Sequence, residues 1–488
     1  MKFLIDTNIF IPLEPTSAAD VSPLTEGAAA LLKSALDADF QLYTHPVALE
    51  DLKRDQNLER RRLRILLLSK YPPLPDPPPI STDIRTQLGD PGPDSHDWVD
   101  HHLLTALAVD AVDMLITEDR KIHGKAKRLG LNDRVLTLSE ALAFIPRLAD
   151  QIPAPLPAIR TVKAHSIDPK DPIFESLRIE YSDFDSWFQK CRREHRQAWV
   201  IDGPDGSLAG LCLVKRENEL PSGITGKALK ISMFKVSEVF SGFRFGELLL
   251  KAVFEYAWLN RHDWLFITVF EKHGLLIDLL QEFGFTILPI RSELGELILT
   301  KPLNPDAPPS DGLDPLEYHI RYGPHLFRTD VAWYIIPILP RYSGALFPES
   351  TRQTGLYPGS TAFGNAIRKA YLSNSKIRSV PKGALLLFYQ SRADRGVIAL
   401  GVSEGTFRSS SPNIILRIVA KRTVYTLEEI TALCARSTLV ILFRQARIFW
   451  PPLLLRDLTK NRVISCAPQS ITRIRKEGIE WLKTAIAV

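Results

Sequence analysis

The chain has 488 residues, of which 45% are hydrophobic, and this size predicts several domains, about three in number. No apolar run reaches the roughly 18 residues of a membrane-spanning helix, and an acidic residue interrupts the N-terminal run, so the sequence predicts a soluble, cytoplasmic protein without membrane contact. The net charge of +5 conceals an asymmetry, because residues 361–488 carry 21 Lys/Arg against 7 Asp/Glu, a net +14 that favours nucleic acid as a partner; a solvated surface without a ligand is the alternative.

Residues 1–150 alternate apolar strands with amphipathic helices, which is the pattern of a parallel sheet covered by helices. The segments that carry this pattern are FLID, TEGAAALLKSALDA, FQLYTHPVALEDLKRD, HHLLTALAVDAVDMLITED and RVLTLSEALAFI. The proline-rich stretch YPPLPDPPPI predicts a surface loop, and QIPAPLPAIR marks a domain boundary near residues 150–157.

Four acidic residues stand at strand ends or helix starts of this segment. Asp6 ends the first strand and Asp119 closes the strand MLITED, while Glu50 and Asp100 each begin a helix. Because loops after parallel strands meet at one edge of a sheet, we expect these carboxylates to converge there. A hard divalent cation, Mg²⁺ or Mn²⁺, would relieve their repulsion and activate water for phosphodiester hydrolysis. Each acid taken alone is better explained as a helix cap.

The strand ending in DTN and the later strand ending in TED, with a helix-initiating Asp before the latter, resemble the PIN-domain ribonucleases over about residues 1–145. The resemblance implies a homodimer and one catalytic metal site formed by Asp6, Glu50, Asp100 and Asp119. It also implies that these ligands are supported by Thr7, Asn8 and Thr117. Tight motifs fix only Asp6 and Asp119. The rival acids for the two middle positions are Asp51, Asp55 and Asp97.

Residues 158–303 predict a second α/β domain, in which KISMFKVSEVFSGFRFGELLLKAVFEYAW reads as a strand, a short loop and a helix. A loop of exposed N–H groups at a helix N-terminus favours an anion. The arrangement resembles the acyl-CoA-binding motif of GNAT N-acetyltransferases, and Gly284-Phe285 matches the terminal GF of that fold. The resemblance implies an α+β fold and acetyl-CoA as cofactor, bound at Val236, Arg244, Phe245 and Gly246.

The match to the GNAT motif is partial. Ser241 replaces Arg/Gln, and Arg244 replaces the middle Gly, where a side chain crowds the approach of a phosphate although a guanidinium can also pair with one. Leu280 occupies the position where the family often has a Tyr that protonates the leaving thiolate. The candidates for deprotonating an amine acceptor are Glu238 and Glu271, and each is also explained as a solvated surface acid.

After the linker NPDAPPSDGLDP, residues 316–488 contain short β-rich pieces separated by turns, the pattern of a small barrel. PKGALLLFYQSRADRGVIALGVSEGT resembles the PUA-like group that includes ASCH and EVE domains, which bind RNA or modified bases in a basic cleft. The resemblance implies RNA contacts by Arg368, Lys369, Lys376, Arg378, Tyr389 and Arg392. Tyr389 or Tyr371 would stack on a base, unless these aromatics fill the barrel core. His319 and His325 have no acid or Cys at ligand spacing and are expected to be loop residues.

Three hypotheses for function follow. The leading one is an Mg²⁺- or Mn²⁺-dependent RNA endonuclease, because an acidic cleft needs a polyanionic substrate that the basic segment would bind. The second is acyl-CoA-dependent N-acetylation of a protein or RNA acceptor, with acetyl-CoA binding that collapses when Gly246 is enlarged. The third is a non-catalytic RNA-binding scaffold. A nuclease joined to an acetyltransferase-like domain suggests, by fold-level analogy alone, a toxin–antitoxin or stress-response system.

Overall fold

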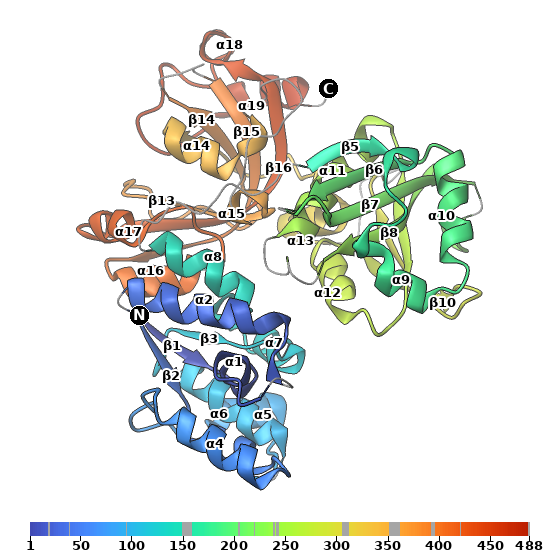
Figure 1. Ribbon diagram of the computed structural model, residues 1–488. Coiled ribbons are helices and arrows are strands. Elements are labelled where there is room, and N and C mark those ends of the chain that lie inside the picture. Colours follow the sequence, from blue (N-terminus) through green and yellow to red (C-terminus); the bar gives the residue numbers. More distant parts are fainter. Residues whose placement is uncertain are drawn as a thin grey trace. The chain divides into compact units, whose positions relative to one another are not determined.

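The computed structural model shows a mixed α/β chain in two compact units (Figure 1). Unit 1 contains Met1–Pro153 and Ser409–Ser437, and unit 2 contains Ala154–Arg408 and Thr438–Val488. The structure describes the chain except residues 18–19, 39, 94, 149–158, 204, 219, 238–239, 241–243, 305–311, 351–361, 392–395, 420 and 487–488, and the side chains of 147–148 and 362–363. No helix within this part of the chain has the length and apolar character to cross a membrane. The multidomain α/β class predicted from the sequence is confirmed.

A four-stranded parallel sheet forms the centre of unit 1, in the order β2-β1-β3-β4. Its strands are β1 (Lys2–Ile5), β2 (Gln41–Thr44), β3 (Met114–Ile116) and β4 (Val135–Leu136). The inner strands come from the apolar runs FLI and MLI, which are buried because a sheet covered on both faces buries both sides of each strand. Ile5 pairs with Thr44 on one side and with Ile116 on the other. These three strands therefore end level, and the residues that follow them share one edge.

The helices of the N-terminal segment are α1 (Thr7–Leu13), α2 (Pro23–Asp37), α3 (Ala48–Lys53), α4 (Leu58–Leu68), α5 (Thr82–Leu88), α6 (His96–Ala108), α7 (Arg120–Arg128) and α8 (Leu138–Leu148). Side chains cap the starts of several of these helices, as the Ser22 capping box does at α2 and Ser95 does at α6. The buried face of α6 joins the sheet in one core, where Leu103 and Leu107 cluster with Leu115. This packing places the start of α6, with its two acids, beside the sheet.

A segment from the far end of the chain completes unit 1. Helices α16 (Pro412–Val419) and α17 (Leu427–Cys434) lie between β15 (Gly396–Ser409) and β16 (Thr438–Leu454) of unit 2. Its basic side chains pair with acids of the N-terminal segment: Arg417 with Asp113 (2.7 Å), Lys421 with Glu140 (3.0 Å) and Arg422 with Asp133 (2.8 Å). Part of the C-terminal positive charge therefore neutralises acids of this chain, whereas the sequence alone assigned the whole of 316–488 to one nucleic-acid-binding domain.

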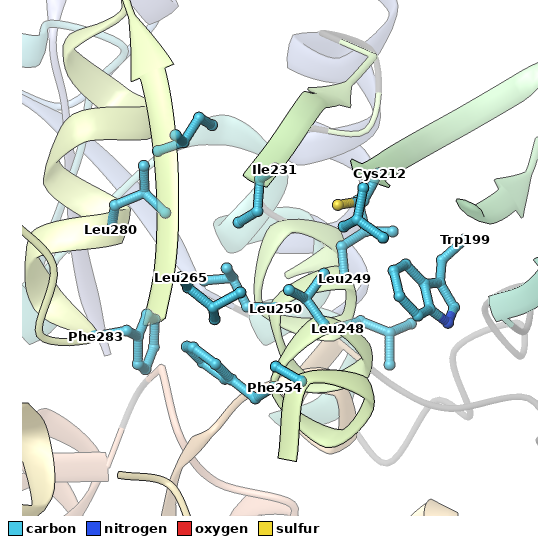
Figure 2. Close-up of a cluster of buried hydrophobic side chains, with 14 of the residues drawn as sticks. Trp199, Cys212, Ile231, Leu248, Leu249, Leu250, Phe254, Leu265, Leu280 and Phe283 are labelled. Carbon is cyan, nitrogen blue, oxygen red and sulfur yellow. The ribbon is translucent and has the colours of Figure 1, made fainter. Parts of the chain in front are cut away.

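The first half of unit 2 is a seven-stranded sheet in the order β10-β11-β9-β8-β7-β6-β5. Its strands are β5 (Ile159–Lys163), β6 (Gln197–Asp202), β7 (Leu208–Glu217), β8 (Ala228–Val236), β9 (Trp264–Val269), β10 (Thr286–Arg291) and β11 (Leu297–Pro302). Neighbours run antiparallel except β8 and β9, which run parallel. The helices here are α9 (Glu175–Glu180), α10 (Phe184–Arg193), α11 (Phe245–Leu259) and α12 (Gly274–Glu282). Figure 2 shows Leu249 and Phe254 of α11 in the core with Ile231 and Leu265 of the sheet.

The second half of unit 2 has a six-stranded sheet in the order β13-β16-β15-β14-β12-β17. Besides β15 and β16, its strands are β12 (Trp333–Ile338), β13 (Arg368–Ser373), β14 (Leu385–Gln390) and β17 (Thr472–Arg473). The helices are α13 (Pro315–Tyr322), α14 (Pro340–Leu346), α15 (Ala362–Asn365), α18 (Leu455–Lys460) and α19 (Lys476–Ile486). Within the described residues β13 and β17 stand at opposite ends of the sheet, so the closed small barrel stays a prediction.

The two halves of unit 2 are joined by tight contacts. Lys301 Nζ of β11 donates to the carbonyl oxygens of Ile320 (2.8 Å) and Arg321 (2.9 Å) at the end of α13. Gly284 has a φ of +85°, and a Cβ there would stand only 1.9 Å from Ile320 O. The glycine of the predicted GF pair is therefore required by this close packing as well as by its backbone conformation.

Candidate functional sites

In unit 1, the carboxylate of Asp6 lies in a hydrogen-bond network at the level edge of the sheet. One oxygen caps α1 by accepting from Thr7 N (2.7 Å), and the residue is 7% exposed. The other oxygen accepts from Asn8 Nδ2 and from Thr117 Oγ1, both at 2.7 Å. Thr117 Oγ1 also accepts from Asp119 N at 3.0 Å. Thr7, Asn8 and Thr117 thus orient Asp6 from both sides of its carboxylate.

The environment of Asp6 disfavours its ionised form. Burial raises the pKa of Asp6 to about 6 in spite of the hydrogen bonds from Thr117 and Thr7, and the charges of Asp100 and Asp51 add to the rise. Asp51 shares Thr7 with Asp6, because Thr7 N donates to Asp6 at 2.7 Å and Thr7 Oγ1 donates to Asp51 at 2.6 Å. The structure therefore brings Asp51 beside Asp6.

Lys125 of α7 lies between two of the predicted acids. Its Nζ is 2.6 Å from Asp97 Oδ1 and 2.6 Å from Asp100 Oδ2, and its side chain is 10% exposed. The hydrogen bond from Lys125 lowers the pKa of Asp97, whereas burial raises the pKa of Asp100 and the charge of Asp119 adds to that rise. An ammonium group thus supplies the positive charge that the sequence-based hypothesis assigned to a metal ion.

Glu50 and Asp51, neighbours on α3, point to different surroundings. The side chain of Glu50 is 48% exposed and pairs with Lys53 at 2.6 Å. Asp51 accepts from Thr7 Oγ1 at 2.6 Å, beside Asp6. The acid that α3 contributes to the cluster is therefore Asp51, one of the rivals, while Glu50 faces solvent.

Two further acids, Asp55 and Asp119, have hydrogen-bond partners that account for their positions. Asp55 contacts Arg60 (2.6 Å) and Arg64 (2.8 Å), and the hydrogen bond from Arg60 is the main reason that the pKa of Asp55 falls to about 2. Asp119 is the N-cap of α7 and accepts from Lys121 N at 2.7 Å. The helix-cap explanation thus applies to Asp119, and Asp55 belongs to an arginine pair.

A divalent cation needs several oxygen ligands that face it. In the part of the chain that the structure describes, no group of three or more His, Cys, Asp or Glu side chains is arranged to bind a metal ion. The oxygens of Asp6 and Asp100 have Asn8, Thr117 and Lys125 as partners. The residues as arranged here do not fit the predicted Mg²⁺ or Mn²⁺ site of Asp6, Glu50, Asp100 and Asp119.

In unit 2, the parallel strands β8 and β9 are paired along only part of their length. Their register ends at Ile231 and Ile267, although β8 continues to Val236 and β9 to Val269. At the same point the pairing of β8 with β7 skips Ser232. One extra residue in a strand is a β-bulge, which bends the strand and strengthens its twist. The bulge at Ser232 therefore accounts for the separation of the two strands.

The far half of β8 carries unpaired backbone groups. Ser237 N donates to Ala209 O beside β7, and bonded and open positions alternate along an antiparallel pair. The N–H and C=O groups of Phe234 and Val236 therefore point away from β7, toward the side that β9 has left. Within the described residues no backbone group pairs with them there. This open edge is the feature of unit 2 best suited to an extended ligand.

Helix α11 begins beyond the end of β8. Arg244, its N-cap, has φ 60° and ψ 23°, the left-handed conformation that glycine adopts at least cost, and this is the position where the GNAT motif has Gly. The Arg244 guanidinium pairs with Glu247 at 2.8 Å, and that acid is 3% exposed. Phe245 is buried. The predicted positions Ser241 and Glu238 lie outside the described residues.

Gly246 lies where α11 meets α12. A Cβ at Gly246 would stand 2.9 Å from Leu279 Cδ2 and 3.8 Å from Phe234 Cε1. Enlarging this glycine would thus move a side chain of α12 even with no ligand present. Leu280 is fully buried in the core that Figure 2 shows, so the predicted Tyr position carries no proton donor. Glu271, a candidate base, is 66% exposed and pairs with Arg291 at 2.5 Å.

A polar cluster that sequence reasoning missed lies at the end of β9. Tyr181 OH donates to Glu296 Oε1 at 3.1 Å, and Ser292 Oγ donates to Glu296 Oε2 at 3.0 Å. Glu296 is 6% exposed. Burial and the charges of Glu296 and Glu180 raise the pKa of Tyr181. These residues come from the end of α9 and from the β10–β11 turn, and no motif of the sequence marks them.

Three of the six predicted RNA-contacting residues of the C-terminal segment have partners within unit 2 or lie in its core. Arg368 pairs with Glu282 at 2.5 Å. Lys369 is 0% exposed and donates to Gly364 O at 2.8 Å, and burial lowers the pKa of this lysine. Tyr389 is 0% exposed and belongs to the core. These three side chains stabilise the fold, and the core explanation of the aromatics applies to Tyr389.

The other predicted positions divide by exposure. Lys376 and Arg378 are exposed, and Arg392 lies outside the described residues. Tyr371 is 8% exposed and packs in the interior. His319 is part of α13 and 3% exposed, so the expectation of a loop residue was wrong, and burial lowers its pKa to about 3. Within the described residues, Lys376 and Arg378 are the exposed members of the predicted set, and RNA binding by this set stays a prediction.

Comparison with known proteins gives partial similarity. No protein-family model matches the sequence, and no curated protein matches it. Similar solved structures include ASCH from Zymomonas mobilis (16% identity, 31% of this chain and 94% of that chain, TM-score 0.25), the IAA acetyltransferase from Bacillus cereus (18%, 30% and 98%, 0.23) and an acetyltransferase of the GNAT family from Staphylococcus aureus (14%, 30% and 100%, 0.24). At these TM-scores the similarities carry no argument about activity. The PIN resemblance of residues 1–145 stays a prediction.

Proposed function

We propose that residues 158–303 form an acyl-CoA-dependent N-acyltransferase. The observation that carries the proposal is the separation of β8 from β9 after Ile231 and Ile267, which leaves the backbone groups of Phe234 and Val236 without a strand partner. Backbone groups that lack a strand partner can bind an extended ligand, which then forms the missing hydrogen bonds.

Coenzyme A matches this edge in shape and chemistry. Its pantetheine arm is an extended chain with amide groups, so it can take the place of the missing strand along β8. The 15-residue helix α11 begins beyond the same strand end, and the positive end of a helix dipole favours a diphosphate. Glu247 in the first turn would oppose an anion, but Arg244 pairs with it and neutralises its charge. The left-handed backbone of Arg244 keeps the turn that a glycine would form there.

The thioester, when bound, supplies an activated acyl group. The chain's own part is to align that group with an amine at the carboxyl ends of β8 and β9. Phe270, Tyr181 and Glu296 stand at this end, and the buried Glu296 carboxylate accepts a hydrogen bond from Tyr181 OH. Because Leu280 cannot donate a proton, the proton that the leaving thiolate takes up would come from the acceptor amine or from solvent.

Calorimetric binding of acetyl-CoA to the full chain tests the proposal. Val236→Pro removes the N–H that faces the open side and leaves the bonds between β7 and β8 intact, because that N–H does not point to β7. One hydrogen bond contributes about 0.5–1.5 kcal/mol, so the proline variant is expected to bind about three- to tenfold more weakly. Val236→Ala keeps the N–H and is the matched control. Absence of binding by the wild type would refute the proposal.

A second candidate is phosphodiester hydrolysis by unit 1, favoured by the position of Asp51 beside Asp6, where both carboxylates accept from Thr7. The test is cleavage of end-labelled RNA by the full chain with Mg²⁺ or Mn²⁺, compared with Asp6→Asn and with EDTA. Metal-dependent cleavage that Asp6→Asn abolishes would establish it. Uncut RNA of varied structure would leave the acids as a structural cluster around Lys125.

A further inference from the structure

Glu180 and Phe270 form a cradle for an ammonium group at the end of β9. The side chain of Glu180 is 9% exposed, and one of its oxygens is 2.8 Å from Lys272 Nζ and 3.0 Å from His273 Nε2. Lys272 Nζ also lies 5.6 Å from the centroid of the Phe270 ring, within the range of a cation–π contact. That ring stacks on Tyr181 with centroids 5.7 Å apart. A carboxylate and an aromatic face thus bind the same primary ammonium.

The two sides of this ion pair differ in exposure. The side chain of Lys272 is 62% exposed, while the carboxylate that it contacts is nearly buried. Burial raises the pKa of Glu180, but the hydrogen bonds from Lys272 and His273 outweigh this effect and lower it. The carboxylate is therefore stabilised in its charged form by the partners around it. An exposed lysine gives such a pair only about 0.2–1 kcal/mol, so another ammonium can replace Lys272 at small cost.

The cradle stands at the end of the sheet that the proposed function uses. Phe270 directly follows β9, whose last residue, Val269, pairs with Leu297 of β11. Because β8 and β9 are parallel, their carboxyl ends lie at the same end of the sheet, and α11 begins beyond the end of β8. An amine in the cradle would thus be at the end where the two strands have separated.

Resting on the proposed N-acyltransferase function, we propose that the acceptor is a primary alkylammonium whose charged head replaces Lys272 between Glu180 and Phe270. Lys272 itself is the internal occupant of this amine site and becomes acylated when no acceptor is present. Exposed apolar side chains lie near the cradle along the chain, which suits an ammonium carried on an alkyl chain: Ile179 (89%) next to Glu180 and Leu275 (53%) after His273.

The transfer balances in atoms and charge. The ammonium first gives one proton to the Glu180 carboxylate, and the neutral nitrogen attacks the thioester carbonyl. A C–N bond forms and the C–S bond breaks, which releases the coenzyme as a thiolate. The second proton leaves the nitrogen as the amide forms; one of the two protons returns to the thiolate and the other goes to solvent. The products are the N-acyl amine and free coenzyme A.

Amine binding is measured first without any acyl-CoA. Cadaverine, an alkyl diamine, is titrated calorimetrically into the full chain, into Lys272→Met and into Lys190→Met, a control in which an exposed lysine paired with Glu194 at 4.0 Å is removed. Lys272→Met is expected to bind cadaverine about two- to fivefold more tightly, since the competing pair is lost, and Lys190→Met to match the wild type. Glu180→Gln is expected to bind about two- to fivefold more weakly, because it removes the carboxylate of the same exposed ion pair. Equal affinities in all four proteins would overturn the inference.

Acylation is then followed by peptide mass spectrometry after incubation with acetyl-CoA. We expect acetyl-Lys272 in the wild type, less of it with cadaverine or a lysine-containing peptide, and transfer to whichever of the two is the true acceptor source. Bound acetyl-CoA with neither Lys272 nor either amine acetylated would overturn the inference while leaving cofactor binding in place. Cadaverine binding that follows the variants in a protein that binds no acetyl-CoA would instead refute the proposed function and leave the amine site standing.

Discussion

The pKa of Asp6 tests directly whether the acids of unit 1 converge. An ordinary aspartate has a pKa of 3.8, and the Asp6 carboxyl has one of about 6. This difference corresponds to about 3 kcal/mol against the ionised form. The folded pKa lies above the unfolded one, so the contribution of Asp6 to stability is largest below pH 4 and is lost as the pH rises toward 6.

The perturbation is the removal of a neighbouring charge. Asp100→Asn and Asp51→Asn should each lower the pKa of Asp6, because both charges raise it, while burial keeps that pKa above the ordinary value. The assay is NMR titration of aspartate carboxyl carbons in selectively labelled protein, with the Asp6 signal assigned by its absence in Asp6→Asn. Asp83→Asn, at an exposed site on α5, is the matched control. An Asp6 pKa near 3.8, or one unmoved by both substitutions, would refute the convergence.

Three further predictions concern stability. Arg422→Met should lower the free energy of unfolding of unit 1 by about 2–3 kcal/mol in urea denaturation, because it leaves Asp133 unpaired; a double-mutant cycle with Asp133→Asn that gives no coupling would contradict the pair. Burial lowers the pKa of His45 from 6.5 to about 4, so between these values the unfolded state binds a proton that the folded state does not. The free energy of unfolding should therefore decrease by up to about 3 kcal/mol as the pH falls from 6.5 to 4. His45→Asn should flatten this pH dependence, and an unchanged slope would contradict the prediction. Gly246→Ala should change thermal stability by less than about 1 kcal/mol, because the atom it meets is the end of the Leu279 side chain; a larger loss in calorimetry would show that α12 cannot adjust.

Local patterns predicted the parts of unit 1 that local chemistry decides. The apolar runs FLI and MLI gave parallel neighbours, and the side chains of DTN orient Asp6 as expected, because these contacts are made within a few residues or across paired strands. The choice between Glu50 and Asp51 could not be made in this way. It depends on how α3 is rotated against Thr7, which tertiary packing sets.

The features that sequence reasoning missed depend on long-range contacts. The docking of residues 409–437 in unit 1 joins Arg417 and Arg422 to acids about three hundred positions earlier, and charge counting cannot distinguish such pairs from a nucleic-acid surface. Lys369 was predicted to contact phosphate, but it is buried. The alternation of residues along a strand does not show which of its two faces will be covered. The ammonium cradle joins α9 to residues that follow β9, and no spacing along the chain marks it.

The most direct test of the acyltransferase account is turnover. The full chain is incubated with acetyl-CoA and either cadaverine or a lysine-containing peptide, and free coenzyme A and acetylated amine are quantified for the wild type, Val236→Pro and Val236→Ala. The account predicts that the wild type and Val236→Ala each release one free coenzyme A for every acetylated amine. At limiting acetyl-CoA, Val236→Pro should form both products more slowly. Equal rates in Val236→Pro and Val236→Ala, or no acetylated amine from the wild type, would contradict it.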